Sequence, residues 1–178
     1  MDQIVSFMEA VCDALSKVEL REPLVAVDED ETSERELYEK IIAACSAKSL
    51  ITRRPEVIPS GGFFCKRRLQ GDLMFQVRPS GKVYVEIKIL RANNGGGVTS
   101  AAVSDIRNAV LQTVEYSNCY KSDCAILLII DEAKKCSLEH DDREMLKTCE
   151  TLLSGDMGLT VGHIYKNSGE WTWEFMRF

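Results

Sequence analysis

The chain has 178 residues, of which 45% are hydrophobic and 28% are charged, a balance typical of a globular protein that can bury its own core. Its formal net charge of -6 at pH 7 argues against a protein that coats nucleic acid through general positive charge. A nuclease is not excluded, because metal-binding carboxylates lower the net charge and basic residues can still cluster locally.

The first part of the chain predicts two helices. Apolar residues recur at helical spacing between residues 3 and 18. A second helix is predicted over about residues 34–47, because Ser33 and Glu36 form a capping-box pattern and the apolar residues that follow keep helical spacing. The acidic segment 25–31 between the two helices is predicted to be a loop.

The middle of the chain predicts a hairpin, a long helix and a buried strand. Residues 73–77 and 82–90 have the composition of strands and flank a Pro-Ser-Gly turn at residues 79–81. A long helix is predicted over residues 99–120 from the spacing of its apolar residues. Residues 124–131 (CAILLIID) form a continuous apolar run, typical of a strand that is buried on both faces of a sheet.

The last part of the chain predicts one more helix and a second hairpin. The helix is predicted over residues 137–154. The segments 159–166 and 171–178 are predicted to be the two strands of the hairpin, joined by a turn at residues 167–169 (Asn-Ser-Gly). The elements together predict a single α/β domain over residues 1–178.

The residues that carry candidate chemistry lie on the first predicted hairpin, in the segments QGDLMFQV and VYVEIKI. Asp72 opens the first strand, and alternation along the second strand places Glu86 and Lys88 on one face, about 7 Å apart. Asp72 and Glu86 on neighbouring strands would repel each other unless a cation lay between them, and two such oxygens suit Mg²⁺ or Mn²⁺. The carbonyl of Ile87 could add a ligand, and Lys88 would then orient or activate the attacking water.

A lone Glu-x-Lys pair is more often part of a solvated strand face, where Glu86 and Lys88 would pair with Gln76 or Arg78. The order of the flanking elements favours the catalytic interpretation. Helix, strands, a strand with Asp, a strand with Glu-x-Lys, helix and buried strand resemble the αβββαβ core of the PD-(D/E)XK (restriction-endonuclease-like) nuclease superfamily, over about residues 33–131.

The resemblance implies a central mixed sheet flanked by helices. The N-terminal helix and a C-terminal extension over about residues 137–178, a helix plus a β-hairpin, are predicted from the residues themselves and lie outside the resemblance. The resemblance also implies a metal-dependent nuclease in which Asp72, Glu86 and Lys88 occupy the positions of the family motif. Residue 71 is Gly, where the family's name has Pro.

The helix before the motif resembles another part of such enzymes. Residues 33–38 (SERELY) are similar to the ERELV-type helix start of archaeal Holliday-junction resolvases. The similarity implies that Glu34 is a helix carboxylate that supports the metal site, with Glu36 and Glu39 as the alternatives. The plainer interpretation is acidic charge that complements the dipole at the start of a helix.

The long helix after the motif contains Gln112 and Tyr116, which share a helix face because they are four residues apart. The pair resembles the QxxxY element of RecB-type and λ-exonuclease-type nucleases. The resemblance implies that both side chains lean toward the metal site.

Basic residues cluster before the motif and indicate where a phosphate backbone would run. They are Arg53, Arg54, Lys66, Arg67 and Arg68. A solvated loop and strand edge is the alternative interpretation. The two histidines, His140 and His163, lie away from the motif and are interpreted as surface or strand residues.

The cellular context follows from the cysteines and the hydropathy. Seven scattered cysteines, with no CxxC or Cys/His pair, indicate reduced core residues in a reducing compartment, the cytoplasm or nucleus. The first residues lack the pattern of a secretory signal, and the longest apolar run, residues 125–130, is too short to span a bilayer. We therefore expect an intracellular protein with no membrane association.

The sequence predicts a Mg²⁺- or Mn²⁺-dependent endonuclease or exonuclease, with DNA as the preferred substrate and RNA as an alternative. A cap-snatching RNA endonuclease domain of segmented negative-strand RNA viruses is similar in size and motif order. A catalytically silent nuclease-fold module that binds proteins would fit the net charge and the aromatic C-terminal hairpin, which also predicts a homo-oligomer or a contact within a larger protein. A flavodoxin-like or Rossmann-like domain would require a fully parallel sheet.

Overall fold

The computed structural model describes residues 2–18, 30–56, 58–59, 68–69, 71–77, 81–90, 100–131 and 158–176. Its elements are α1 (Asp2–Leu15), α2 (Asp30–Ala47), β1 (Thr52–Arg53), β2 (Ile58–Pro59), β3 (Arg68–Leu69), β4 (Leu73–Val77), β5 (Gly81–Leu90), α3 (Ser100–Tyr120), β6 (Cys124–Asp131), β7 (Gly158–Asn167) and β8 (Glu170–Met176). None of the helices in these ranges is long and apolar enough to cross a membrane.

Six of the strands form one mixed sheet in the order β1-β4-β5-β6-β7-β8, while β2 and β3 form a separate antiparallel pair. The neighbours β1, β4 and β5 are antiparallel, β5, β6 and β7 are parallel, and β8 is antiparallel to β7. The predicted α/β class with a central mixed sheet between helices is therefore confirmed. The fully parallel sheet that a flavodoxin-like domain needs is excluded.

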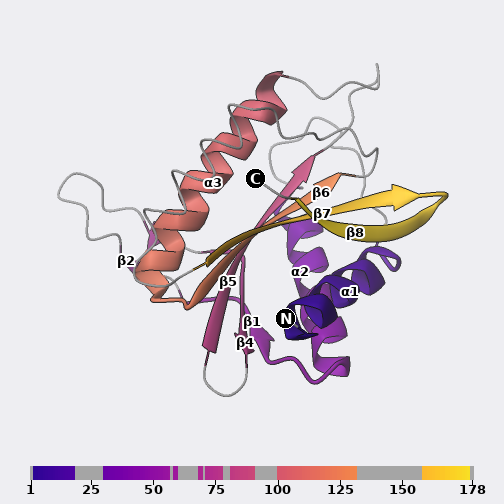
Figure 1. The fold of residues 1–178 in the computed structure, drawn as a ribbon, viewed down its shortest axis with the longest axis horizontal. Helices are drawn as coiled ribbons and strands as arrows, with labels where there is room; N and C mark the ends of the chain where they lie inside the picture. The colour runs from indigo at the N-terminus through magenta and orange to yellow at the C-terminus, as the bar shows by residue number, and fades with distance from the viewer. Residues whose placement is uncertain are drawn as a thin grey trace.

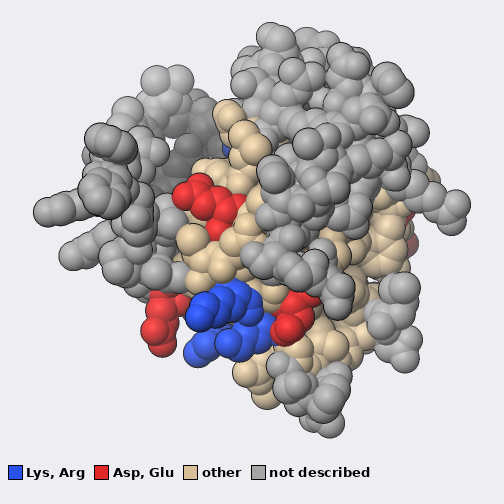
Figure 2. Space-filling model, turned by 60° about the vertical axis from the view of Figure 1, so that its left-hand side comes forward, with Lys and Arg blue, Asp and Glu red and all other residues tan. Residues whose placement is uncertain are grey.

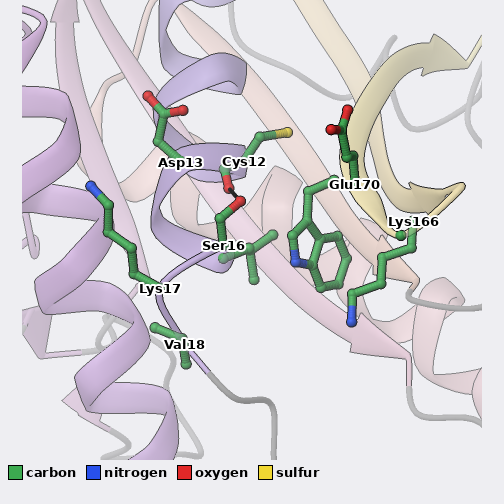
Figure 3. Close-up of a pocket in the computed structure, with 10 residues that line it drawn as sticks. Cys12, Asp13, Ser16, Lys17, Val18, Lys166 and Glu170 are labelled. Atoms are coloured by element: carbon green, nitrogen blue, oxygen red, sulfur yellow. Dashed lines mark hydrogen bonds between the residues drawn. The ribbon is translucent and has the colours of Figure 1, made fainter.

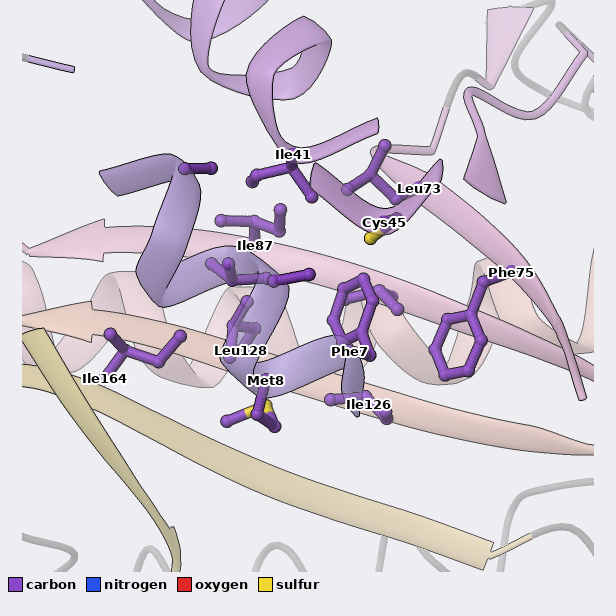
Figure 4. Packing of buried hydrophobic residues seen from close by; sticks show 14 of the residues in the cluster. Phe7, Met8, Ile41, Cys45, Leu73, Phe75, Ile87, Ile126, Leu128 and Ile164 are labelled. Carbon is purple, nitrogen blue, oxygen red and sulfur yellow. The ribbon is translucent and has the colours of Figure 1, made fainter. Parts of the chain in front are cut away.

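The helices cover the two faces of the sheet (Figure 1). On one face, α1 and α2 pack on a core in which the rings of Phe7 and Phe75 stack with centroids 4.7 Å apart (Figure 4). On the other face, α3 packs against β5 and β6. Alternation along β5 therefore directs Val85 and Ile87 toward α1 and α2, and Tyr84 and Glu86 toward the α3 face.

One helix starts earlier than predicted, and another predicted helix cannot be compared. Helix α2 begins at Asp30, so Ser33 lies inside the helix and is not its cap, and part of the predicted acidic loop is helical. Acidic residues in a first turn are stabilised by the helix dipole, which allows the earlier start. The helix predicted over residues 137–154 lies outside the described residues.

The predicted C-terminal hairpin is confirmed, and it makes a strand pairing that the sequence did not indicate. Ser168 and Gly169 have φ angles of 52° and 89°, as a two-residue type I′ turn requires. Strand β7 also pairs in parallel with β6, so the hairpin extends the central sheet instead of forming a separate appendage. The side chains of Trp171 and Trp173 pack against the core on the α1 face.

Candidate functional site

Asp72 and Glu86 lie side by side on neighbouring strands. The register of β4 and β5 pairs Leu73 with Val85, so Asp72, one residue before β4, comes next to Glu86. Glu86 is buried, with 8% of its surface exposed, and Asp72 is half-buried. The strand geometry thus holds two acids together with little water around one of them.

Two hydrogen bonds fix the Asp72 carboxylate. The hydroxyl of Tyr38, on α2, donates to Asp72 Oδ1 at 2.9 Å. The backbone amide of Ile87 donates to Asp72 Oδ2 at 2.7 Å. The guanidinium of Arg54 lies over the ring of Tyr38, 5.1 Å from its centroid. Asp72 is therefore held between α2 and β5 in one orientation.

Glu86 accepts a hydrogen bond from the hydroxyl of Tyr84, two residues earlier on the same face of β5. Burial and the negative charge of Asp72 raise the pKa of Glu86 to about 8, against the hydrogen bond from Tyr84 and the positive charge of Lys88, which lower it. Burial and the charge of Glu86 also raise the pKa of Tyr84, so its hydroxyl stays a donor. Without a cation, Glu86 is protonated over most of the neutral range.

Aromatic residues of α3 close the site. The ring of Tyr84 stacks on that of Tyr120, with centroids 5.7 Å apart, and meets Tyr116 edge-on at 6.0 Å. The Tyr120 hydroxyl accepts a hydrogen bond from the amide of Gly71 at 3.2 Å and donates to the carbonyl of Glu56 at 2.9 Å. Burial raises the pKa of Tyr116 and of Tyr120.

Gly71 occupies a position where the structure leaves no space for a larger residue. A Cβ at this position would lie 2.4 Å from Cε2 of Tyr84, closer than real contacts allow. A proline would add that Cβ and would also remove the amide that Tyr120 binds. The absence of a side chain at Gly71 is therefore what allows the ring of Tyr84 to pack there.

Of the other predicted site residues, some lie near Asp72 and Glu86 and others do not. Lys88 is half-buried on the same face of β5 as Glu86, and Tyr116 lies at the Tyr84 ring. Gln112 is exposed on α3, so the structure does not bring it into the cluster as Tyr116 is brought. Glu34 lies on α2 one helical turn before Tyr38, but its side chain is outside the described part.

The predicted basic cluster is only partly described. Arg53 and Arg54 are exposed at β1, while Lys66 and Arg67 lie outside the described residues, as does the side chain of Arg68 on β3. Figure 2 shows basic side chains next to acidic ones on one face of the molecule. In that view the described surface carries mixed charge and not a broad basic area.

Few of the described side chains at this site could bind a metal ion. Among the side chains that the structure describes, no three His, Cys, Asp or Glu residues come close enough to hold a metal ion. Burial and the charge of Asp72 both raise the pKa of Glu86, and a divalent cation between the two carboxyl groups would offset both effects. Mg²⁺ commonly binds through one or two carboxylates and keeps several waters.

Tyr38, Tyr84 and Tyr120 belong to the site, and sequence reasoning did not assign them a role. Two of them could have been found from the spacing of residues in the sequence. Tyr84 shares the strand face of Glu86, and Tyr120 lies one helical turn after Tyr116. Tyr38 also lies one helical turn after the predicted site residue Glu34, but its contact with Asp72 spans 34 residues of chain and does not follow from that spacing.

His163 is a strand residue, as one of the two interpretations had it, but it is not on the surface. It lies on β7 with 1% of its surface exposed. Its Nδ1 is 3.3 Å from Glu174 Oε1, and its Nε2 is 3.5 Å from Oδ2 of the buried Asp131. The position of His140 is outside the described residues.

A separate hollow lies on the α1 face of the sheet, between the end of α1 and the turn between β7 and β8 (Figure 3). Its charged lining residues are Asp13, Lys17, Lys166 and Glu170. The two acids balance the two lysines, so the lining favours neither an anion nor a cation. None of the predicted site residues lines this hollow.

No protein-family model matches the sequence. No curated protein matches it. Among solved structures, the chain is similar to Pyrococcus furiosus SfsA in complex with Ca²⁺, with a TM-score of 0.41 and 15% identity, over 82% of this chain and 63% of that one. The chain thus spans less than two thirds of that protein. At this similarity, only the chain's own residues can carry a functional conclusion.

Replacing Gly71 with Ala should lower the free energy of unfolding by about 1–3 kcal/mol, because the new methyl group would collide with the Tyr84 ring. Chemical unfolding followed by circular dichroism measures this change. Gly158→Ala is the matched control, since a Cβ there meets nothing within 4 Å. Equal effects of the two substitutions would contradict the packing of Tyr84 on Gly71.

Replacing Glu86 with Gln should stabilise the metal-free protein at high pH. The raised pKa means that the folded protein binds this proton more tightly than the unfolded chain, so stability is lost as pH rises from about 4.5 to about 8. The variant lacks that loss and should exceed wild type by about 1–3 kcal/mol above pH 8, with a smaller difference near pH 5.

Urea unfolding in EDTA between pH 5 and pH 9 measures the effect of Glu86→Gln. Glu115→Gln is the control, because Glu115 is exposed on α3 and its neutralisation removes no buried charge. A difference between Glu86→Gln and wild type that stays constant across this range would show that Glu86 does not titrate as its surroundings require.

Proposed function

We propose that this chain is a metal-dependent nuclease of the PD-(D/E)XK type, which hydrolyses phosphodiester bonds in nucleic acid. The observation that carries the proposal is the pair of carboxylates, Asp72 and Glu86, placed side by side by the strand register with one of them buried. Such a pair destabilises a metal-free fold, and functional sites are where proteins keep strongly perturbed groups of this kind. A divalent cation is the partner that would relieve the repulsion.

Mg²⁺ or Mn²⁺ would be held by Asp72, Glu86 and the carbonyl of Ile87. Asp72 is oriented in advance by Tyr38 and by the Ile87 amide. The amide and the carbonyl of a strand residue point to the same side, which turns the Ile87 carbonyl toward Asp72 as well. Glu34 would add a carboxylate from α2. These donors, completed by water, suit the coordination habits of Mg²⁺.

Lys88 is proposed to position the attacking water. It lies on the same face of β5 as Glu86, and its positive charge already lowers the pKa of that carboxyl. An ammonium at this place would also offset the negative charge that grows on the phosphate during reaction. A bound divalent cation would supply polarisation of the phosphate and a more acidic water.

The tyrosines have a supporting role in this proposal. Tyr84 donates its hydroxyl hydrogen to Glu86 and so fixes the carboxyl in place. Tyr116 and Tyr120 hold the Tyr84 ring from α3. Gln112 would have to turn inward on substrate binding to take the part that the QxxxY resemblance implies.

Arg53 and Arg54 are the described residues best placed to track a phosphate backbone. Both are exposed, and Arg54 lies over the ring of Tyr38, whose hydroxyl binds Asp72. A guanidinium beside the carboxylate pair suits a phosphate next to the scissile bond. Lys66, Arg67 and Arg68 would extend this track, with DNA as the preferred polymer and RNA as the alternative.

The test is cleavage of single-stranded and double-stranded DNA and RNA with Mg²⁺ or Mn²⁺. Wild type should cut at least one polymer, and Glu86→Gln and Lys88→Ala should each lose at least about 100-fold in rate. Lys82→Ala is the control on the same strand, because Lys82 is exposed near the start of β5. Titration with Mn²⁺ by calorimetry gives a second readout, in which Glu86→Gln should bind more weakly than wild type.

Three results would overturn the proposal. One is wild type that cuts no polymer and binds no Mn²⁺, which would leave a nuclease-like fold that serves as a protein-binding module. Another is activity that survives in Glu86→Gln and Lys88→Ala. The last is a loss of activity in Lys82→Ala as large as in Lys88→Ala, which would assign the effect to the strand and not to the site.

A further inference from the structure

The two edges of the six-stranded sheet differ in how they are protected. Strand β1 has only two residues and is followed by Arg54 and Pro55, which discourage another strand from pairing. Strand β8 has seven residues with no Lys, Arg or Pro, and it pairs with β7 from Met176 to Glu170 without a bulge. Among the described strands, β8 has a neighbour on its β7 side alone. Strand β8 therefore offers a longer pairing edge than β1, with Glu170 and Glu174 as its charged residues.

The turn geometry shows which groups of β8 face away from β7. A two-residue type I′ turn is closed by a hydrogen-bonded pair, here Asn167 and Glu170. Hydrogen-bonded pairs then alternate along an antiparallel ladder. Residues 170, 172, 174 and 176 therefore bond to β7, and the backbone amides and carbonyls that point outward are those of Trp171, Trp173 and Phe175.

The same three residues carry the large side chains of this edge. Each is half-buried against the core on the α1 face, and the rings of Trp173 and Phe175 are 5.1 Å apart. A row of partly exposed aromatic rings beside backbone groups that bond to no other described strand gives both the area and the hydrogen bonds that a second strand would use.

We propose that β8 pairs with β8 of a second copy of this chain, antiparallel, around a twofold axis at Trp173. In this register Trp173 faces Trp173 of the partner subunit, and Trp171 faces Phe175 of the partner subunit. Every outward amide and carbonyl of these residues then has a backbone partner. The two six-stranded sheets become one continuous sheet.

Charge selects this register among its neighbours. With the axis at Trp173, Glu174 faces Thr172 of the partner subunit and Glu170 faces Met176 of the partner subunit, so no like charges are opposite. An axis at Thr172 would place Glu170 against Glu174 of the partner subunit. An axis at Glu174 would place Glu174 against itself.

The pairing leaves the carboxylate pair open, because β6 and β7 separate β8 from β5. The dimer is therefore independent of the proposed nuclease activity, and either can fail without the other. It requires only the edge strand and its aromatic residues.

Sedimentation equilibrium of the full chain should show a monomer–dimer equilibrium. Thr172→Glu would face Glu174 of the partner subunit twice in each dimer and should weaken dimerisation about 3-fold to 10-fold, while Thr172→Lys should strengthen it by a similar factor. Ile51→Glu adds the same charge beside β1, where Ile51 is 64% exposed, and should leave the dimer unchanged. Thermal unfolding at high dilution confirms that each variant is folded.

Amide hydrogen exchange measured by NMR tests the register directly. In the dimer, the amides of Trp171, Trp173 and Phe175 should be protected, and their protection should fall on dilution. The amides of residues 172 and 174 bond to β7 and should stay protected throughout. A chain that stays monomeric up to about 100 μM, where a weak interface would still form, overturns the proposal. So does a dimer in which the outward amides exchange freely, or one that both Thr172 variants shift in the same direction.

Discussion

The end of the β4–β5 ladder is the constraint on which the candidate site depends. Strand β4 begins at Leu73, opposite Val85, whereas β5 continues to Leu90 with β6 as its only neighbour there among the described strands. The amide of Ile87 is thus left without a strand partner, and a buried amide needs an acceptor. Asp72 supplies it, at 2.7 Å. The backbone amide of Ile87 therefore favours a carboxylate at residue 72, next to Glu86.

The hydrogen bonds around Asp72 and Glu86 lower the free-energy cost of placing two acids together, while burial adds to that cost. Tyr38 and Tyr84 each donate a hydrogen bond to one carboxyl group. The rings of Tyr84 and Tyr120 exclude water, which strengthens those bonds and also raises the pKa of Glu86. A proton neutralises Glu86 in the metal-free protein, and in the proposed nuclease a divalent cation would compete with that proton for the same carboxyl.

Strand periodicity was enough to predict part of this arrangement. Alternation along β5 placed Glu86 and Lys88 on one face, and the apolar run of β6 predicted a strand buried inside the sheet. The contact of Tyr38 with Asp72 and the burial of His163 could not be predicted, because both depend on how distant segments meet. The start of α2 at Asp30 was missed because a capping pattern at Ser33 competes with a favourable helix dipole.

The antiparallel and parallel parts of the sheet also differ in how far their strands pair. Its antiparallel half, β1, β4 and β5, ends its ladders early and so exposes backbone groups that polar side chains can use. The parallel strands β5 and β6 pair residue by residue from Val83 with Cys124 to Leu90 with Asp131, so the buried Glu86 and Asp131 lie within a continuously paired centre of the sheet. Strands β7 and β8 pair without a bulge from Val161 with Met176 to Asn167 with Glu170, and β8 forms that edge of the described sheet. The early end of the β4–β5 ladder is where Asp72 meets the Ile87 amide, whereas the β7–β8 ladder continues without a bulge to the proposed dimer edge.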